Sequence, residues 1–270
     1  MFTSAAPAPS PATNDNEALV LRAGSVLPFR RKAHRAPARQ RIYAIGDIHG
    51  RADLLKALLY KIGADALDCQ AAQTTLVFLG DYIDRGPQSR QVIEHILKLR
   101  EAGHDLRVLR GNHEAALLDF LSRPETGKHW LALGGAETLY SYGIRAPGRD
   151  ASPRDLQYAA LELNAALPAS HLQFLRELET YVQLGDYLFV HAGLRPGRTL
   201  AKQTETDLIN IREPFLNSRA RWPYTVVHGH SPAPEPAQKR GRISLDTGAY
   251  ATGRLSAVRL EDAEVGFLTT

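Results

Sequence analysis

Aspartate, histidine and asparagine side chains recur in this chain directly after short apolar runs. Asp47 and His49 come after the run at 42–45, and Asp81 comes after the run at 76–79. A β-rich run that ends at glycine and then presents such side chains is typical of a site along one sheet edge of an α/β fold. Because carboxylate, imidazole and amide groups without thiolate suit manganese, iron or zinc, the pattern predicts a metal site. Its candidate ligands are Asp47, His49, Asp81, Asn112, His191 and His230.

Two neighbouring ions are the arrangement that we expect. Asp47 and His49, two residues apart on one loop, can turn toward the same ion, and Asp81 is the natural bridging carboxylate. The second ion would be completed by Asn112, His191 and His230. Two ions about 3.5–4 Å apart can bind a phosphoryl group and lower the pKa of a bridging water. This chemistry predicts hydrolysis by direct attack of that water, without a covalent enzyme intermediate.

Other polar side chains on the same loops could donate a proton and bind phosphate. His113 follows Asn112 directly and should point elsewhere, free to act as general acid to the leaving oxygen, with Asp84 available to orient its imidazole. Guanidinium groups offer paired hydrogen bonds to phosphate oxygens. The arginines on or near these loops are the expected substrate clamp, namely Arg85, Arg110 and Arg212.

Strand, loop and helix alternate in the segment that must position these side chains. The apolar residues of 42–45, 75–79 and 106–109 predict strands, each followed by a helix with its apolar residues on one stripe. We expect these helices at 52–62, 88–100 and 114–121. Three consecutive strand–helix units imply a largely parallel sheet covered by helices.

A helical insertion and a second sheet are predicted after these units. Residues 124–180 have the pattern of short helices and turns, with longer helices at 153–163 and 170–178, and we expect them beside the mouth of the site. The chain then returns to short β-rich runs, for which we expect a second, mainly antiparallel sheet packed on the first. Those runs are 181–184, 187–190, 224–227, 242–245 and 255–260.

Composition sets bounds on the class of protein. The chain has 270 residues and is 44% hydrophobic, which suits one catalytic domain, placed at 41–270, behind a disordered or linker-like tail at 1–40. Its single cysteine, Cys69, excludes an internal disulfide framework and gives no sign of an oxidising compartment, so we expect a cytoplasmic protein. The sequence contains no run long enough to span a membrane, and its start does not resemble a secretory signal.

A basic stretch without acidic residues lies at 30–41. The net charge of +4 permits an anionic partner. We interpret the stretch as a solvated linker, because blocks of like charge often have no specific partner and no aromatic side chain is interleaved to stack on bases. Nucleic acid is therefore an unlikely partner.

Three sequence blocks carry a resemblance to a known family. Segments 46–50 (Gly-Asp-Ile-His-Gly), 80–86 (Gly-Asp-Tyr-Ile-Asp-Arg-Gly) and 111–114 (Gly-Asn-His-Glu) resemble the signature blocks of the PPP metallophosphoesterases, the serine/threonine protein phosphatases with a dinuclear metal centre. The similarity runs from about Arg41 to the end of the chain. It implies an α/β (α+β) fold, a four-layer β-sandwich of two mixed sheets flanked by helices. It also implies the ligands, acid pair and arginine contacts named above, with two divalent ions, manganese first and iron or zinc as alternatives.

The closing blocks refine this resemblance. Segments 191–197, 227–232 and 246–250 are similar to the bacterial, phage-type and Rhizobiales-like members, in which phosphotyrosine as well as phosphoserine and phosphothreonine can be substrates. Symmetrical diadenosine tetraphosphate hydrolases are relatives of these proteins. The blocks that contain His49 and Asp84 nevertheless look like the protein phosphatase pattern.

Two polar residues near the candidate ligands have open roles. His228 lies two residues before His230, so it could be a ligand, a support for a ligand or a packed core histidine. The family pattern selects His230. Asp246 follows a predicted strand, and we interpret it as supporting a ligand rather than binding an ion itself.

These observations favour one function and leave two alternatives. We expect a metal-dependent phosphomonoesterase that acts on phosphoproteins or phosphopeptides, at serine and threonine and/or tyrosine. The alternative enzyme is a hydrolase of nucleotides or dinucleoside polyphosphates. A hypothesis from another class is a non-catalytic module that binds phosphate or nucleic acid.

Overall fold

The first sheet contains the predicted parallel strands, in a computed structural model that describes residues 1, 33–67, 71, 73–239 and 241–270. Its strand order is β10-β9-β1-β2-β3, with β1–β2 and β2–β3 parallel and the last two strands in sequence antiparallel. The strands are β1 (Gln40–Ile45), β2 (Gln73–Phe78), β3 (Asp105–Val108), β9 (Ser256–Glu261) and β10 (Glu264–Thr269). The parallel arrangement predicted for β1, β2 and β3 is therefore present.

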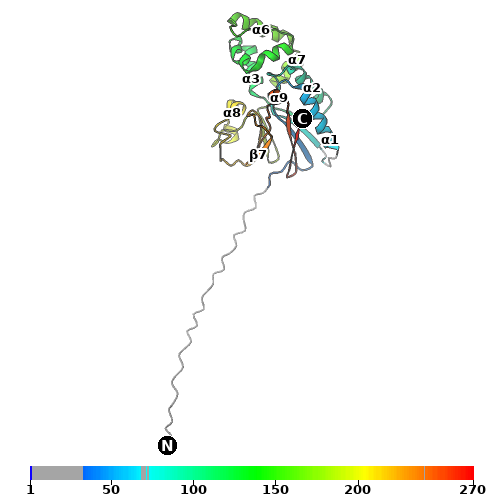
Figure 1. Cartoon of the computed structure of the whole chain (residues 1–270), viewed down its shortest axis with the longest axis vertical. Helices are drawn as coiled ribbons and strands as arrows, with labels where there is room; N and C mark the ends of the chain where they lie inside the picture. The colour runs from blue at the N-terminus through cyan, green and yellow to red at the C-terminus, as the bar shows by residue number, and fades with distance from the viewer. Residues whose placement is uncertain (2–32, 68–70, 72, 240) are drawn as a thin grey trace. The chain divides into compact units, whose positions relative to one another are not determined.

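Three helices follow the parallel strands, as their apolar spacing predicts (Figure 1). They are α1 (Ala52–Leu67), α2 (Ser89–Glu101) and α3 (Asn112–Ser122). On α1 the buried residues Leu55, Leu58 and Ile62 recur at helical spacing and join the same apolar cluster as Tyr43 and Ile45 of β1. These helices therefore cover one face of the first sheet.

The second sheet packs against the other face of the first. Ile42 and Ala44 of β1 belong to a different apolar cluster from Tyr43 and Ile45, because successive strand residues point to opposite faces. That cluster also contains Val227 of the second sheet, so it forms the core between the two sheets. The expected sandwich of two mixed sheets flanked by helices is confirmed.

Strand pairing in the second sheet differs from the expectation of a mainly antiparallel sheet. Its order is β4-β5-β6-β8-β7, with β5–β6 and β6–β8 parallel and the two outer pairs antiparallel. The long connection between β5 and β6, which contains the helix α8 (Glu205–Asn210), permits a parallel crossover. The strands are β4 (Tyr181–Leu184), β5 (Tyr187–Val190), β6 (Thr225–His228), β7 (Ala237–Lys239) and β8 (Arg242–Ser244).

The run predicted at 255–260 belongs to the first sheet instead of the second. As β9 it pairs with β1, with Leu260 opposite Ile42, and its outer neighbour is β10. Residue Leu260 thereby enters the core between the sheets. The helix α8 covers the outer face of the second sheet, where Leu208 packs with Leu188. The layers are therefore helix, sheet, sheet and helix.

The predicted helical segment between α3 and β4 is present and lies at the end of the domain away from β7 (Figure 1). Its two longer helices occupy the expected places. The first, α6, begins with a capping box in which Asp155 N donates to Ser152 Oγ at 3.3 Å and Ser152 N donates to Asp155 Oδ2 at 2.8 Å. The elements are η1 (Pro124–Thr126), α4 (Gly127–Trp130), η2 (Leu131–Gly135), α5 (Ala136–Ser141), α6 (Pro153–Ala166) and α7 (Ala169–Arg176).

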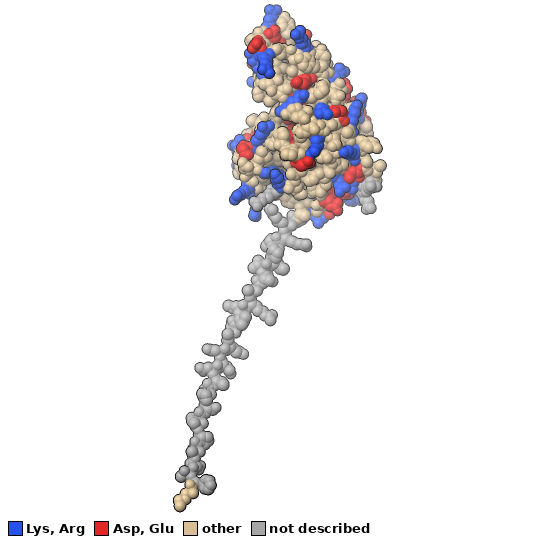
Figure 2. Space-filling model, viewed as in Figure 1, with Lys and Arg blue, Asp and Glu red and all other residues tan. Residues whose placement is uncertain are grey.

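Part of the basic stretch lies in the compact unit Ala33–Thr270, where two of its arginines form ion pairs. Arg35 Nη1 donates to Asp262 Oδ2 at 2.7 Å, and Arg41 Nε donates to Glu261 Oε2 at 2.7 Å. Basic and acidic side chains are interspersed on the face seen in Figure 2. Most of the predicted tail, from residue 2 to residue 32, and Cys69 lie outside the described residues. Among the helices that are described, none is long and apolar enough to cross a bilayer.

Candidate metal centre

The candidate ligands lie on loops that leave the carboxyl ends of strands from both sheets. Asp47 and His49 follow β1, and Asp81 follows β2. Asn112 is the first residue of α3, directly after the loop that leaves β3. The remaining two candidates, His191 after β5 and His230 after β6, come from the second sheet. Sandwich packing therefore brings together side chains that are far apart in sequence.

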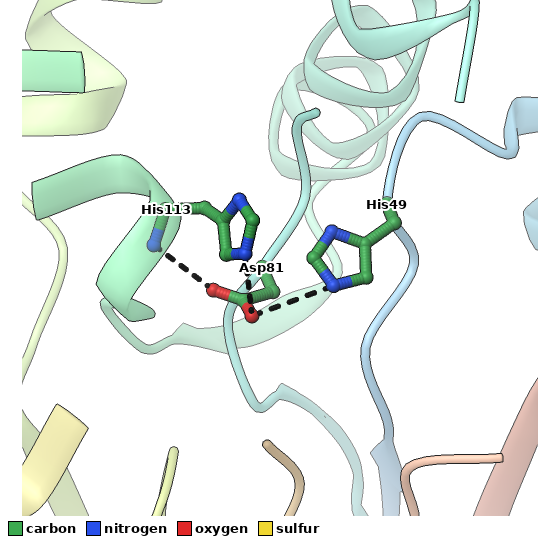
Figure 3. A group of neighbouring side chains, drawn as sticks. All are labelled: His49, Asp81 and His113. Atoms are coloured by element: carbon green, nitrogen blue, oxygen red, sulfur yellow. Dashed lines mark hydrogen bonds and ion pairs between the residues drawn. The ribbon is translucent and has the colours of Figure 1, made fainter. Parts of the chain in front are cut away.

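The carboxylate of Asp81 is the centre of this arrangement. Its Oδ2 lies 3.5 Å from His49 Nε2, 3.8 Å from His113 Nε2 and 3.4 Å from His191 Nε2. His49 and His113 each turn Nε2 toward the same carboxylate (Figure 3), and their ring centroids lie 4.6 Å apart. Two sets of ligand atoms, each within 4.8 Å of one another, share this carboxylate. The sets are His49, Asp81 and His113, and Asp81, His191 and His230.

Backbone carbonyls orient the two imidazoles nearest to Asp81. His49 Nδ1 lies 2.9 Å from Ile83 O, and His191 Nδ1 lies 3.0 Å from Leu79 O. Because a carbonyl only accepts, each Nδ1–H donates and each Nε2 is turned toward the centre. Burial lowers the pKa of His49 to about 3. Burial would also lower the pKa of His191, but the negative charge of Asp81 outweighs it and raises that pKa to about 10. The position of this imidazole is therefore one where Asp81 stabilises a positive charge.

The environment of Asp47 fits a metal ion. Its Oδ2 accepts from His230 N at 2.9 Å, whereas its buried Oδ1 has no hydrogen-bond partner among the described residues. Burial, reinforced by the charge of Asp246, raises the pKa of Asp47 well above its usual range. A buried carboxylate oxygen without a donor is costly unless a cation compensates it. Asn112 supplies a further oxygen, with Oδ1 3.1 Å from His191 Nε2.

The loop that carries Asp81 is held by a side chain whose role the sequence pattern did not single out, Glu114. Its buried carboxylate accepts from the backbone N–H groups of Asp81, Tyr82, Ile83 and Gly111. Burial, helped by the charge of Asp81, raises the pKa of Glu114 to about 7. From the third position of α3 it accepts from the N–H of Gly111, which is the glutamate half of a capping box; Gly111 has no side chain to complete the motif, so the sequence did not contain the full signal.

His113 and Asp84 form the predicted contact. His113 Nδ1 lies 2.7 Å from Asp84 Oδ2, and both side chains are buried. Burial lowers the pKa of His113, but the carboxylates of Asp81 and Asp84 outweigh it and the net shift is upward. Asp84 also accepts from Trp130 Nε1 at 3.0 Å and from Thr138 Oγ1 at 2.6 Å. The helical insertion therefore reaches directly into the centre.

The loops around the centre have strained backbones. Left-handed φ angles occur at the non-glycine residues His49 (44°), Asp81 (50°), Asp84 (71°), Arg85 (66°) and His230 (62°). Such conformations are uncommon outside glycine and gather at functional sites when the surrounding structure imposes them. Each of these residues belongs to the set predicted from the sequence.

The predicted arginines differ in their surroundings. Arg85 Nη1 lies 3.1 Å from His49 Nε2, and Arg212 Nη2 donates to His230 O at 3.2 Å, so both touch residues of the centre. Arg110 Nη1 instead donates to Glu205 Oε1 at 2.8 Å. Its guanidinium lines a groove of about 620 Å³ that begins at Asn112 and runs between α3 and α8.

The two residues with open roles lie beside the centre. His228 is buried with its ring edge-on to Phe215, at a centroid distance of 5.0 Å, and it belongs to neither ligand set. Asp246 Oδ1 accepts from Gly248 N at 2.8 Å, and its charge acts on Asp47. This geometry favours a packing role for His228 and a role for Asp246 in supporting Asp47.

A family model for calcineurin-like phosphoesterases matches residues 40–255. The chain belongs to this family. The resemblance to PPP metallophosphoesterases is confirmed, and so is the assignment as a hydrolase of the metallophosphoesterase type. The match spans every candidate ligand, whereas the individual ligand roles stay predictions.

Two bacterial proteins are among the relatives of this calcineurin-like phosphoesterase. The asymmetrical bis(5'-nucleosyl)-tetraphosphatase PrpE of Anoxybacillus flavithermus is 28% identical over 238 residues, which cover 82% of this chain and 90% of the relative. The symmetrical bis(5'-nucleosyl)-tetraphosphatase of Neisseria gonorrhoeae is 27% identical over 271 residues, covering 83% and 93%.

Solved structures support the fold. A candidate diadenosine tetraphosphatase has a TM-score of 0.60 and 23% identity, covering 88% of this chain and 98% of its own. The cold-active protein-tyrosine phosphatase of a psychrophilic Shewanella species has a TM-score of 0.52 and 18% identity, covering 87% and 83%. At these identities the similarity concerns the fold alone.

Proposed function

We propose that this protein is a metal-dependent hydrolase of dinucleoside polyphosphates. The observation that supports this most directly is its similarity, over 82% and 83% of the chain, to relatives named as asymmetrical and symmetrical bis(5'-nucleosyl)-tetraphosphatases. The centre fits the chemistry, since two sets of buried ligand atoms share Asp81 beside arginines that can bind phosphate.

Phosphoproteins were the first substrate expected from the sequence, with dinucleoside polyphosphates as the alternative. The similarity to the named relatives supports the alternative better. The signature blocks look like the protein phosphatase pattern but do not decide between the two, because the metal centre and the phosphate contacts proposed for their residues would serve both substrate classes. Residues that contact the rest of the substrate would lie outside those blocks.

The proposed ligands of two divalent ions are Asp47, His49 and Asp81 for the first, and Asp81, Asn112, His191 and His230 for the second. Their carboxylate, imidazole and amide donors favour manganese, with iron or zinc as alternatives. Bound divalent ions supply Lewis acidity and lower the pKa of a nucleophilic water. Two features support this ligand set: the Nε2 atoms of His49 and His191 are turned toward the centre, and Asp47 Oδ1 accepts no hydrogen bond within the part of the chain that the structure describes.

His113 is the proposed general acid. Its Nδ1–H donates to Asp84, so its Nε2 faces Asp81 and can deliver a proton to the oxygen that leaves the cleaved phosphoanhydride. Asp84 is itself held by Thr138 and Trp130, which keeps the imidazole in one orientation. The upward pKa shift of His113 favours the protonated form that a general acid needs.

Arg85 and Arg212 are the proposed phosphate contacts nearest to the centre. Their guanidinium groups touch His49 and the main chain of His230. Arg110 binds Glu205 in this structure, so its proposed contact with phosphate requires it to exchange that carboxylate for the substrate. The polyphosphate chain would then lie between the centre and the groove that starts at Asn112.

A substrate panel tests the proposal. The full chain, loaded with manganese, is assayed with diadenosine tetraphosphate and with phosphoserine, phosphothreonine and phosphotyrosine peptides at matched concentrations. We expect the highest kcat/KM for the dinucleotide, and separation of the nucleotide products gives the cleavage position. His113→Asn should lose most of the turnover while it retains metal, since its loss costs about 10²–10⁴-fold for a general acid. Faster turnover of any phosphopeptide would reject the proposed substrate class.

A further inference from the structure

Tyr250 is an exposed aromatic side chain at the edge of the centre. It lies in the short helix α9 (Ala249–Thr252), and 40% of its surface is exposed, so core packing does not account for it. Its ring meets His49 edge-on at a centroid distance of 5.5 Å. Arg85 Cζ lies 4.8 Å from the centroid of the same ring. One tyrosine thus contacts both a candidate ligand and a candidate phosphate contact.

Arg85 is held at two ends by elements from distant parts of the sequence. At its base, Arg85 N donates to Gly134 O at 3.0 Å and its Nε lies 3.4 Å from Leu133 O, both in the helical insertion. A Cβ at Gly134 would lie 2.8 Å from Arg85 Cγ, so the insertion packs closely there. At its other end, the guanidinium lies over the ring of Tyr250.

The aromatic contact has a physical effect on the arginine. A guanidinium over an aromatic face is attracted by the ring quadrupole, equivalent to about a two- to fivefold change in an equilibrium constant at an exposed site. The contact also restricts a long side chain that otherwise loses several rotamers when it binds phosphate. An arginine that is already restricted near the centre binds an anion with less ordering cost.

We propose that Tyr250 is a positioning residue that holds Arg85 for phosphate binding. The inference rests on the proposed role of Arg85 as a phosphate contact. It requires only the ring of Tyr250, because both recorded contacts are made by the ring and no hydrogen bond of its hydroxyl is found within the described part of the chain. Phenylalanine should therefore replace it, whereas an aliphatic side chain of similar size should not.

The test compares Tyr250→Leu, Tyr250→Phe, Arg85→Gln and the double variant Tyr250→Leu/Arg85→Gln. Binding of inorganic phosphate to the manganese-loaded full chain is measured by calorimetry, and KM and kcat are measured with diadenosine tetraphosphate. We expect Tyr250→Leu to weaken phosphate binding and raise KM about two- to fivefold, with a smaller change in kcat. Tyr250→Phe should behave like the wild type, and Tyr250→Leu should add nothing when Arg85 is already replaced.

A matched control is Tyr158→Leu. Tyr158 lies on α6 with Arg154 Cζ 5.5 Å from its ring centroid, and it belongs to neither ligand set, so phosphate binding should be unchanged. The inference is overturned if Tyr250→Leu binds phosphate like the wild type, if it has the same effect without Arg85, or if it lowers metal content. Absence of phosphate binding by the wild type overturns it too.

Phosphate binding separates this inference from the proposed substrate. If the protein does not cleave diadenosine tetraphosphate but Tyr250→Leu still loses phosphate affinity through Arg85, the substrate class is wrong and the role of Tyr250 stands. If the dinucleotide is cleaved and the variant binds phosphate normally, the substrate class stands and the role of Tyr250 is rejected.

Discussion

Replacement of Glu114 by glutamine should destabilise the loop that carries Asp81. Each carboxylate oxygen accepts two backbone N–H groups, Oε2 from Asp81 and Gly111 at 3.0 Å and Oε1 from Tyr82 at 2.8 Å and Ile83 at 3.3 Å. Glutamine keeps the size of the side chain but replaces one oxygen with an NH₂ group. That group would face N–H donors and could not accept from them.

The expected magnitude follows from the two hydrogen bonds that are lost. Hydrogen bonds to charged groups contribute about 1.5–3 kcal/mol each, which gives about 3–6 kcal/mol for the pair. Part of this is offset, because the variant no longer buries a charge, and the raised pKa of Glu114 shows that burial disfavours the ionised form. We therefore expect the free energy of unfolding to fall by about 2–4 kcal/mol.

The measurement is urea unfolding of metal-free protein at pH 8, with Glu125→Gln as the matched control. Glu125 is exposed on η1, and its replacement should change stability by less than about 0.5 kcal/mol. Manganese binding is measured in parallel, because displacement of the Asp81 loop should weaken it. A loss below about 1 kcal/mol, or an equal loss in Glu125→Gln, would refute the idea that Glu114 holds this loop.

Two further predictions concern a close contact and an ion pair. Gly229→Ala should weaken manganese binding at least about tenfold, because the new Cβ would lie 1.9 Å from Asp47 Oδ1. The control is Gly148→Ala, whose new Cβ would have no atom of the described residues within 4 Å beyond its two chain neighbours, and calorimetry should show normal manganese binding. The hydrogen bond from Arg195 lowers the pKa of Asp207 in the folded protein. This ion pair therefore stabilises the fold at any pH above the pKa that Asp207 has in the unfolded chain, and the stabilisation is lost as the pH falls through its pKa in the folded protein. Asp207→Asn should therefore be less stable than the wild type at pH 7, with a difference in urea midpoint that shrinks below about pH 4; a difference that is constant with pH would contradict this.

The sequence predicts the parts of the fold that depend on local pattern. The strands β1, β2 and β3 each carry an apolar run, lead into a loop with glycine and are followed by a helix, so their parallel order and the edge that carries Asp47 and Asp81 follow from short segments. Partner choice in the second sheet depends instead on contacts between distant segments. Nothing local shows that Leu260 pairs opposite Ile42 in the first sheet.

Elements with weak patterns were missed for physical reasons. The strand β10 lies at a sheet edge, where its residues are exposed or half-buried, so it has no clear alternation of apolar and polar residues. The helices α8 and α9 are short and carry little periodic signal. The partner of Arg110 was not predicted for the same reason, because Glu205 is the first residue of α8. The contacts of Tyr250 were not predicted either, because Tyr250 lies in α9, which the sequence pattern did not reveal.

The hydrogen bonds from Thr138 and Trp130 to Asp84 limit how this fold can be re-engineered. Residues 124–180 form a separate group of helices, which invites their exchange between relatives as a way to change substrate range. Two of the groups that orient the proposed proton donor are carried on that segment. A chimera with the helical insertion of a relative therefore also loses the two donors to Asp84. It would keep turnover only if the grafted helices supply both hydrogen bonds.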